Sequence, residues 1–279
     1  MRSWSALVAS LAVLSLATPP ALGASAPLPR PAHVVVVIEE NHTFAQIVGN
    51  PHAPFLTALA AHGAAFTNAH GVTHPSLPNY FALFAGLTNT NGDGCPAHAV
   101  PADAPNLGSE LEAAHLSFVG YAESMPEEDW HGCWAGPYAR KHVPWAQFAN
   151  LPRSASEPFT AFPSNLDRLP TVAFVVPNVD DDMHDGTVAQ ADAWARRNLG
   201  PLVRWADAHD TLVILTMDEG YDSTNSIPII FAGPMVRPGR YAQRIDHYNV
   251  LRTLADMYGL TPPGRAARVA PITDCWRVR

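Results

Sequence analysis

The 279-residue chain has 25 acidic and 17 basic side chains, and its formal net charge at pH 7 is −8. A chain this acidic lacks the basic surface that binding to a phosphate backbone requires, so nucleic acid is not an expected partner. The length is enough to bury one large core, and by itself it allows either one α/β domain or two small ones.

The N-terminal residues have the layout of a cleaved secretory signal. Arg2 is followed by an apolar stretch over residues 6–17, which is too short to span a bilayer, and then by small residues. We predict a signal peptide over residues 1–23 and a mature chain over residues 24–279, secreted to the periplasm or the exterior. A retained N-terminal anchor is the alternative, which two prolines near the small residues disfavour. No later stretch approaches the roughly 20 apolar residues of a membrane helix, so stable membrane insertion is not expected.

Three apolar runs are rich in β-branched residues, at 33–38 (HVVVVI), 171–176 (TVAFVV) and 211–217 (TLVILTM). Each run predicts a strand that is buried on both faces. Helical patterns with apolar residues three and four apart accompany these strands, and several of them end at a glycine. The predicted helices cover residues 53–63, 76–86, 107–115, 187–209 and 247–259.

This alternation of strands and helices predicts an α/β fold with a largely parallel central sheet flanked by helices on both faces. Residues 89–170 are rich in Pro, Gly, Trp and His and show little regular periodicity. We interpret this stretch as loops and short elements over one face of the sheet. The mature chain is therefore expected to form a single domain.

Polar, carboxylate-rich sequence follows each of the three predicted strands: EENHTF at 39–44, PNVDDDMHDG at 177–186 and DEGYDSTN at 218–225. Open parallel sheets bind their ligands where the strands end and the loops begin. Convergence of three such loops at one edge of a sheet is more specific than any of the motifs alone, and it predicts a functional site there.

Ser76 lies in a constrained segment, GVTHPSLPNY, at residues 71–80. Pro75 and Pro78 suit the entry and first turn of a helix, which places Ser76 at or next to the N-cap. Its hydroxyl could cap the helix, or it could attack a phosphate bound by the free N–H groups at the helix start. Asn79 lies on the same helical face and could donate its amide to an oxygen of that phosphate.

Hard oxygen ligands are available at the ends of the first and third predicted strands. They are offered by Glu40 and Asn41 after the first strand and by Asp218 and Glu219 after the third. Such donors favour one divalent cation, Mg²⁺, Ca²⁺ or Mn²⁺, over zinc or iron. For any single acid the alternative is an ordinary solvated loop residue, and Glu39, which adjoins Glu40, could be mistaken for the ligand.

A histidine flanked by carboxylates suits a general acid that protonates a leaving oxygen. His184 is the candidate, with Asp182 or Asp185 orienting its ring; a salt-bridged surface histidine is the alternative. Two more histidines are candidates without a fixed role. His74 could face the site, and His247 begins a predicted helix, where service at the helix N-terminus is the alternative.

The chain has three cysteines. Cys95 and Cys133 lie in loop-like sequence rich in Gly and Pro, and export permits a disulfide, so we predict that these two pair and that Cys275 is left over. Three unpaired thiols, or a pair that includes Cys275, are the alternatives.

Several of these motifs together resemble the bacterial phosphoesterase family, which contains secreted acid phosphatases and phospholipases C and is part of the alkaline phosphatase superfamily. The resemblance is greatest to the short secreted acid phosphatases, including those that act on phosphatidylinositol 3-phosphate, and it spans nearly the whole mature chain. It rests on EENHTF, THPSLPNY, DDMHDG, MDEGYDSTNSIPIIFAG and DHYNVLRTLADMYGL.

The resemblance implies an alkaline-phosphatase-like three-layer sandwich and gives roles to individual residues. By the family's pattern Ser76 is the nucleophile, Asn79 donates to a phosphate oxygen and His184 contacts the phosphate. The implied ligands of the metal are Glu40, Asn41, Asp218 and Glu219, with Ser76 beside them. Two-zinc members of the superfamily have Asp-His where this chain has Asp218-Glu219, so we predict one metal ion.

The predicted function is that of a secreted, metal-dependent phosphomonoesterase that acts through a phosphoserine, as a monomer, on a small phosphomonoester or a phosphoinositide. Protonation by an imidazolium predicts activity that favours acidic to neutral pH. A phospholipase C acting on a diester is the alternative, and a non-catalytic exported Ca²⁺-binding protein is the alternative from another class. A sulfatase is disfavoured because Cys-x-Pro-x-Arg is absent, and a nucleophile-elbow hydrolase because Gly-x-Ser-x-Gly is absent.

Overall fold

The computed structural model describes residue 1 and residues 27–89, 92–95 and 100–277. Its main feature is an eight-stranded sheet in the order β11-β2-β10-β9-β1-β8-β4-β7. Neighbouring strands pair in parallel, except that β10 runs antiparallel to β9 and β2. The strands of this sheet are β1 (His33–Glu39), β2 (Ala64–Phe66), β4 (Phe118–Ala122), β7 (Ser156–Pro158), β8 (Val172–Val176), β9 (Thr211–Met217), β10 (Ile229–Ala232) and β11 (Gly239–Tyr241).

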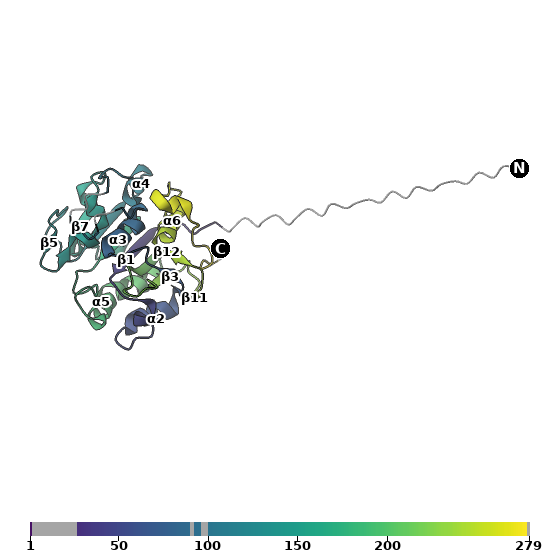
Figure 1. Cartoon of the computed structure of the whole chain (residues 1–279), viewed down its shortest axis with the longest axis horizontal. Coiled ribbons are helices and arrows are strands. Elements are labelled where there is room, and N and C mark those ends of the chain that lie inside the picture. The colour runs from purple at the N-terminus through teal and green to yellow at the C-terminus, as the bar shows by residue number, and fades with distance from the viewer. Residues whose placement is uncertain (2–26, 90–91, 96–99, 278–279) are drawn as a thin grey trace.

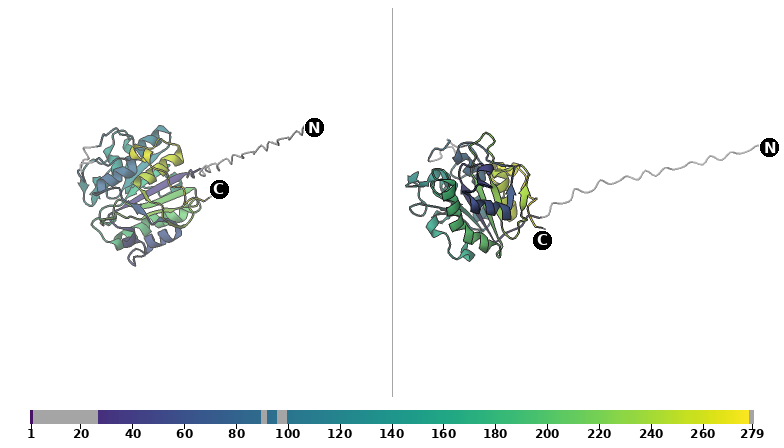
Figure 2. Two further views of the ribbon diagram at one scale, coloured as in Figure 1. Left: turned by 45° about the vertical axis from the view of Figure 1, so that its right-hand side comes forward. Right: turned by 90° about the horizontal axis from the view of Figure 1, so that it is seen from below.

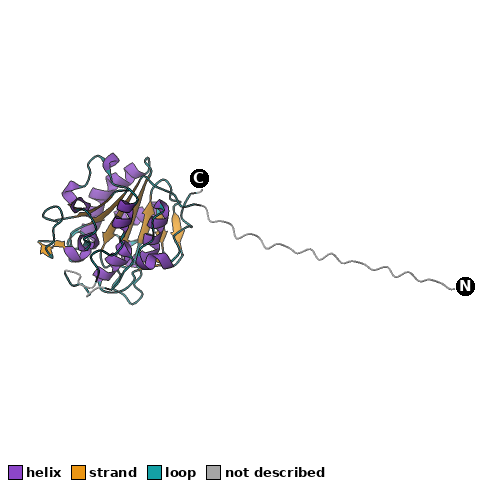
Figure 3. Cartoon of the chain, turned by 90° about the horizontal axis from the view of Figure 1, so that it is seen from above, coloured by secondary structure: helices purple, strands orange, loops and turns teal. Residues whose placement is uncertain are grey.

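Helices cover both faces of the sheet (Figures 1 and 3). On one side α3 packs against α4 and α6, and on the other α2 packs against α5. The helices are α1 (Phe44–Ile47), α2 (Pro54–His62), α3 (Ser76–Ala85), α4 (Leu107–Ala113), α5 (Val188–Ala206) and α6 (His247–Tyr258). The predicted fold class, a largely parallel sheet between two helical layers, is therefore confirmed.

The smaller elements lie at the margins of this sandwich. Two two-stranded sheets pair β3 (Ala69–His70) with β12 (Ile245–Asp246) and β5 (Trp134–Ala135) with β6 (Tyr138–Ala139). The 3-10 helices are η1 (Arg140–His142), η2 (Pro144–Gln147), η3 (Arg153–Ala155), η4 (Phe159–Ala161), η5 (Leu166–Arg168) and η6 (Gly264–Arg268).

The three predicted strands form the centre of the sheet, because β1 lies between β9 and β8. Their side chains are buried almost throughout, which agrees with continuous apolar runs that face a helical layer on each side. Figure 2 shows β1, in purple, among the green strands of the second half of the chain. All three strands run in the same direction, so the loops that follow them meet at one edge.

The interpretation of residues 89–170 as loops over one face was wrong in part. This stretch contains β4, an inner strand paired with β8, and β7, which pairs with β4. It also contributes α4 and the hairpin β5–β6. The segment thus completes one side of the central sheet, in addition to covering it.

The predicted signal peptide over residues 1–23 falls almost wholly outside the described residues. Among the residues that are described, no helix has the length and apolar character needed to cross a bilayer. The prediction of a single domain over residues 24–279 stays a prediction.

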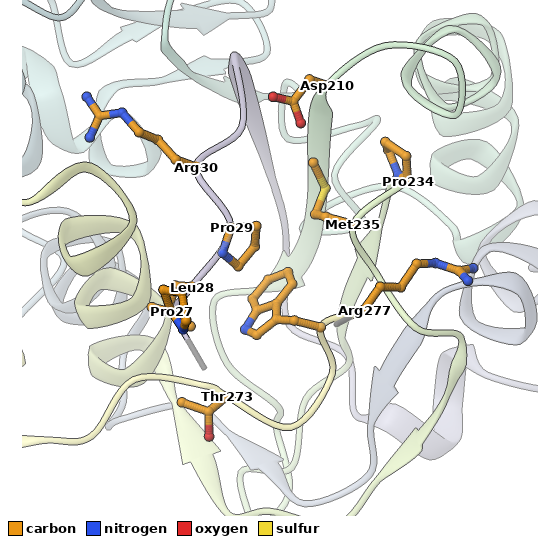
Figure 4. A pocket seen from close by; sticks show the side chains of 10 residues that line it. Pro27, Leu28, Pro29, Arg30, Asp210, Pro234, Met235, Thr273 and Arg277 are labelled. Carbon is orange, nitrogen blue, oxygen red and sulfur yellow. The ribbon is translucent and has the colours of Figure 1, made fainter. Parts of the chain in front are cut away.

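A cavity of about 650 Å³ lies at the opposite edge of the sheet (Figure 4). Arg30, just before β1, and Asp210, just before β9, line it together with Met235 and Arg277. It therefore lies at the amino ends of the central strands. The candidate residues of the sequence lie at the carboxyl ends, where open parallel sheets bind ligands, so this cavity is not their site.

Candidate active site

Backbone hydrogen bonds tie together the loops after the three central strands. The N–H of Asp218 donates to the carbonyl of Glu39 (3.0 Å), and the N–H of Glu40 donates to the carbonyl of Asp182 (2.8 Å). The N–H of Asn41 donates to Asp218 Oδ1 (3.0 Å). The predicted convergence of polar loops at the carboxyl edge of the sheet is thus present in the structure.

Ser76 is the first residue of α3, and the N-cap is Pro75. The capping alternative for the hydroxyl is therefore wrong. Ser76 Oγ lies 3.2 Å from Glu40 Oε2 and 3.3 Å from Glu219 Oε1, and the residue is buried. A hydroxyl has one hydrogen to donate, so only one of the two carboxylates can accept it at a time. The arrangement places a serine hydroxyl at a helix N-terminus between two acids.

The carboxylates around Ser76 are buried and held close to one another. Burial, and next the charge of Glu219, raises the pKa of Asp218 to about 8. Burial also raises the pKa of Glu40 well above its usual range, and the charges of Asp218 and Asp182 add to the effect. In such a site the ionised forms repel one another, and a bound cation removes this repulsion.

Several atoms of these side chains lack a protein partner. Within the described parts of the chain, Asp218 Oδ2 and both polar side-chain atoms of Asn41 have no hydrogen-bond partner, although each residue is 1% exposed. Buried polar atoms are nearly always hydrogen-bonded, so unpaired oxygens next to Ser76 are what a cation site would leave behind. The predicted oxygen ligands therefore fit a divalent ion.

His142 also lies in the site, and the sequence analysis did not identify it. The ring is buried, stacks on Tyr80 at 5.2 Å and lies with Nε2 3.2 Å from Glu40 Oε1 and Nδ1 3.1 Å from Asp182 Oδ2. Tyr80 donates its hydroxyl hydrogen to the same Glu40 oxygen (2.5 Å). Burial, followed by the charge of Lys141, lowers the pKa of His142 well below its usual range, so the ring is neutral and can act as a ligand.

Glu40, His142 and His184 offer ligand atoms that all lie within 4.8 Å of one another, so they could hold a metal ion. Glu40 thus belongs both to this cluster and to the oxygen set around Ser76. The two imidazoles broaden the choice of metal, because nitrogen ligands suit zinc and iron better than they suit Mg²⁺ or Ca²⁺.

His184 is oriented by Asp185, one of the two predicted partners: Nδ1 lies 3.1 Å from Asp185 Oδ1. Asp182 instead accepts the backbone N–H of His184 (2.7 Å) and contacts the ring of His142. His184 Nε2 lies 3.2 Å from Lys141 Nζ. Since an ammonium group only donates, Nε2 accepts in this contact, whereas the predicted acid role needs a hydrogen on the ring nitrogen that faces the leaving oxygen.

Asn79 holds the chain that leads into α3. Its Oδ1 accepts the N–H groups of Val72 (2.9 Å) and Thr73 (3.0 Å), and its Nδ2 donates to the carbonyls of Thr73 (2.9 Å) and Pro75 (3.0 Å). Both amide hydrogens are therefore used within the protein. The role of phosphate donor stays a prediction, and binding a phosphate would require Asn79 to exchange one of these bonds.

The two remaining candidate histidines both contact the loop after β9. His74 Nδ1 pairs with Glu219 Oε2, and its side chain is half exposed. His247 is fully buried at the start of α6, and its Nε2 lies 2.6 Å from the carbonyl of Asp218. His74 can therefore orient the carboxylate that faces Ser76, and His247 the backbone at Asp218.

Cys95 and Cys133 form a disulfide, as predicted, and Cys275 is buried with a free thiol. The disulfide joins the chain after α3 to the hairpin β5–β6, which leads directly into η1. It thereby connects two segments that border the site.

Solved structures with the same fold support the architecture. A protein of the alkaline phosphatase superfamily from Vibrio parahaemolyticus superposes with a TM-score of 0.59 at 13% identity, over 88% of this chain and 72% of that one. A phosphonate monoester hydrolase from Silicibacter pomeroyi gives 0.57 at 12% identity, over 86% and 76%. At this identity the likeness concerns the fold.

Sequence comparisons identify the family. The chain is 50% identical over 275 residues to a phosphatidylinositol-3-phosphatase of Mycobacterium tuberculosis, covering 97% of this chain and 91% of that protein. It is 31% identical over 229 residues to a phosphate-repressible acid phosphatase of Penicillium chrysogenum, covering 75% of this chain and 55% of the fungal protein. The chain thus spans about half the length of the fungal relative. Residues 50–261 match the phosphoesterase family, and the chain belongs to that family.

Proposed function

We propose that this protein is a phosphomonoesterase in which Ser76 is the nucleophile. The observation that carries the proposal is the position of Ser76 Oγ, at the start of α3 and within 3.3 Å of carboxylate oxygens of Glu40 and Glu219. A serine there has an acceptor for its proton and lies at a helix N-terminus, which attracts anions.

The substrate class follows from the relatives. One relative is named as a phosphatidylinositol-3-phosphatase and matches nearly the full length of this chain, and another is named as an acid phosphatase. We therefore propose a phosphoinositide monoester, or a small phosphomonoester, as substrate. The predicted leader makes export part of the proposal, and the enzyme would act as a monomer.

The residues that fit a divalent ion are Glu40, Asn41, Asp218 and Glu219 around Ser76, with His142 and His184 beside Glu40. A cation bound there would supply charge neutralisation at the phosphoryl oxygens and lower the pKa of the serine hydroxyl. The relatives and the oxygen donors favour no single metal, so its identity is left to experiment.

In the proposed reaction Ser76 Oγ bonds to phosphorus as the bond to the leaving oxygen breaks, and the serine proton passes to Glu40 or Glu219. The leaving alkoxide takes a proton from the ammonium group of Lys141, which lies in the wall of the site with Nζ 3.2 Å from His184 Nε2. A water then attacks the phosphoserine and gives its proton to Lys141. The bond from Ser76 Oγ to phosphorus breaks, Ser76 takes back its proton from the carboxylate, and inorganic phosphate leaves.

The test of the nucleophile is Ser76→Ala assayed with p-nitrophenyl phosphate. Release of nitrophenol should fall to background while thermal unfolding stays within a few degrees of the wild type. Ser154→Ala, at an exposed serine in η3, is the matched control and should keep full activity. Substantial turnover by Ser76→Ala would remove Ser76 from its proposed role.

Metal dependence and bond specificity are tested separately. Dialysis against a chelator should suppress turnover, and a divalent ion should restore it; full activity of metal-free protein would contradict the cation site. With phosphatidylinositol 3-phosphate as substrate, release of inorganic phosphate is expected. Release of diacylglycerol would instead identify a phospholipase C.

A further inference from the structure

The Asp93 carboxylate bridges the start of α3 and the only lysine in the sequence. Asp93 Oδ1 accepts the backbone N–H of Leu77 (3.0 Å), and Asp93 Oδ2 lies 2.9 Å from Lys141 Nζ. Leu77 directly follows Ser76, so an oxygen bound to this N–H lies beside the nucleophile. A carboxylate thus occupies the anion-binding end of the helix next to Ser76.

Lys141 is buried, with a side chain that is 10% exposed. Lysines are seldom buried unless their charge is paired, and among the residues that the structure describes the contacts of Nζ are with Asp93 Oδ2 and His184 Nε2. Since an ammonium group has three donors, one direction of Nζ is left for a further acceptor. The segment of Lys141 also brings His142 to Glu40, so this cation belongs to the wall of the site.

The polar atoms assigned above to the cation site show, independently of the helix end, that the site around Ser76 is completed by a group other than protein. Among the residues that the structure describes, the side-chain amide of Asn41 and Asp218 Oδ2 have no hydrogen-bond partner, and both residues are 99% buried next to the Ser76 loop. Unpaired buried polar atoms of this kind indicate that the site is completed by something other than protein.

We propose that Lys141 Nζ and the N–H of Leu77 bind phosphoryl oxygens of the substrate, and that the Asp93 carboxylate occupies the place of the phosphoryl group until substrate binds. A carboxylate and a phosphoryl group both present two oxygens to a pair of donors. This assignment rests on the proposed function, because it names substrate contacts for the same nucleophile.

Asp93 can give up this place without a large rearrangement. Its side chain is a third exposed, so rotation brings the carboxylate into water. Two residues further on, Cys95 is fixed to Cys133 by the disulfide, which keeps the backbone near the site. The substrate therefore has to displace only the Asp93 side chain to reach Lys141 Nζ and the N–H of Leu77.

The test is calorimetric binding of inorganic phosphate to the metal-loaded protein, with KM and kcat for p-nitrophenyl phosphate measured in parallel. Asp93→Asn retains an oxygen for the Leu77 N–H and removes the competing negative charge. Phosphate should bind about tenfold more tightly, and KM should fall by a similar factor. Asp103→Asn makes the same charge change at an exposed acid outside the site and should leave both values unchanged.

Lys141→Met should weaken phosphate binding about tenfold or more, because a charge-assisted contact is lost. This variant leaves Asp93 without its cation, so the double variant Asp93→Asn/Lys141→Met serves if the single one does not fold. The double variant should bind phosphate at least about tenfold more weakly than Asp93→Asn alone.

The assignment is overturned if Asp93→Asn binds phosphate no more tightly than the wild type, which would make Asp93 a permanent support of Lys141. It is equally overturned if the double variant binds phosphate as tightly as Asp93→Asn. Binding needs no turnover, so these outcomes decide the assignment even if the wild type hydrolyses no phosphoester. Lack of hydrolysis would refute the proposed function alone.

Discussion

Glu39 and Glu40 are adjacent, both are fully buried, and only one of them faces the candidate site. Successive side chains of a strand point to opposite faces, so Glu40 meets Ser76 and Tyr80 on the α3 side. Glu39 is on the other face. Burial, and next the charges of Asp182, Asp181 and Asp192 of α5, raise its pKa. Within the described chain both oxygens of Glu39 lack a hydrogen-bond partner. The raised pKa means that burial favours the protonated, neutral form of this carboxyl.

This contrast predicts opposite results for the same substitution. Glu40→Gln removes a carboxylate that contacts Ser76 and faces His142, so kcat should fall by about 100-fold or more, as for loss of an essential acid–base or ligand group. Glu39→Gln replaces a carboxyl whose neutral form is favoured by burial with a neutral amide of similar shape, so kcat/KM should stay within about threefold. Steady-state kinetics and thermal unfolding of the two variants check this. Equal loss of activity in both would contradict the assignment by face.

The sequence predicted the acids of the site better than its histidines and lysine. Glu40 and Asp218 directly follow apolar runs, so their place at the ends of strands is readable from local pattern. His142 and Lys141 lie in η1, a short 3-10 helix that directly follows β6, and no periodicity in the sequence places them. Their partners are distant in sequence: Asp182 is 40 residues from His142, and Asp93 is 48 residues from Lys141. Only the folded chain reveals these contacts.

At the scale of elements, the start of α3 depends on the loop that precedes it. Four hydrogen bonds from the Asn79 side chain hold that loop, and Asn79 is fully buried. This predicts that Asn79→Ala leaves several partly buried backbone groups without these partners and costs about 2–4 kcal/mol of stability. For a chain of this size the melting temperature should fall by roughly 5 °C or more. Calorimetric unfolding measures it. A variant that loses phosphate binding at unchanged melting temperature would show that Asn79 acts only on the phosphate.

The strand β4 shows why part of the sheet was not predicted. Its sequence, FVGYA, is short and has Gly120 at its centre, which weakens any strand signal. In the structure a Cβ at Gly120 would overlap the indole ring of Trp145, so the glycine is required by packing. The helices α2, α3, α5 and α6, with nine to nineteen residues each, have clear periodicity, and their ends were predicted to within three residues. Local pattern therefore suffices for long elements and fails where a tertiary contact selects the residue.

At the scale of the whole molecule, the fold concentrates negative charge at the carboxyl edge of the sheet. The chain has eight more acidic than basic side chains, and several acids of the site are almost fully buried. Burial favours the protonated form of such groups, so the folded, metal-free protein holds protons that the unfolded chain releases. A divalent ion would stabilise the same carboxylates in their ionised form. The site thus links folding, pH and metal binding.

This linkage predicts the pH dependence of stability. The pKa of Asp218 is raised from 3.8 to about 8. The contribution of this carboxyl to the free energy of unfolding is fully present below its pKa in the unfolded chain. That contribution is lost as the pH rises toward 8, and above this pH the free energy of unfolding no longer changes through this group. Between pH 5.5 and 7.5 the metal-free protein should therefore lose about 2 kcal/mol of stability through this group, or roughly 5 °C in melting temperature.

Asp218→Asn cannot titrate and should lack this part of the pH dependence, which makes it the control. A divalent ion should raise the wild-type melting temperature more at pH 7.5 than at pH 5.5, because it binds the ionised carboxylate. If the metal-free wild type and Asp218→Asn show the same pH dependence, Asp218 does not hold the proton.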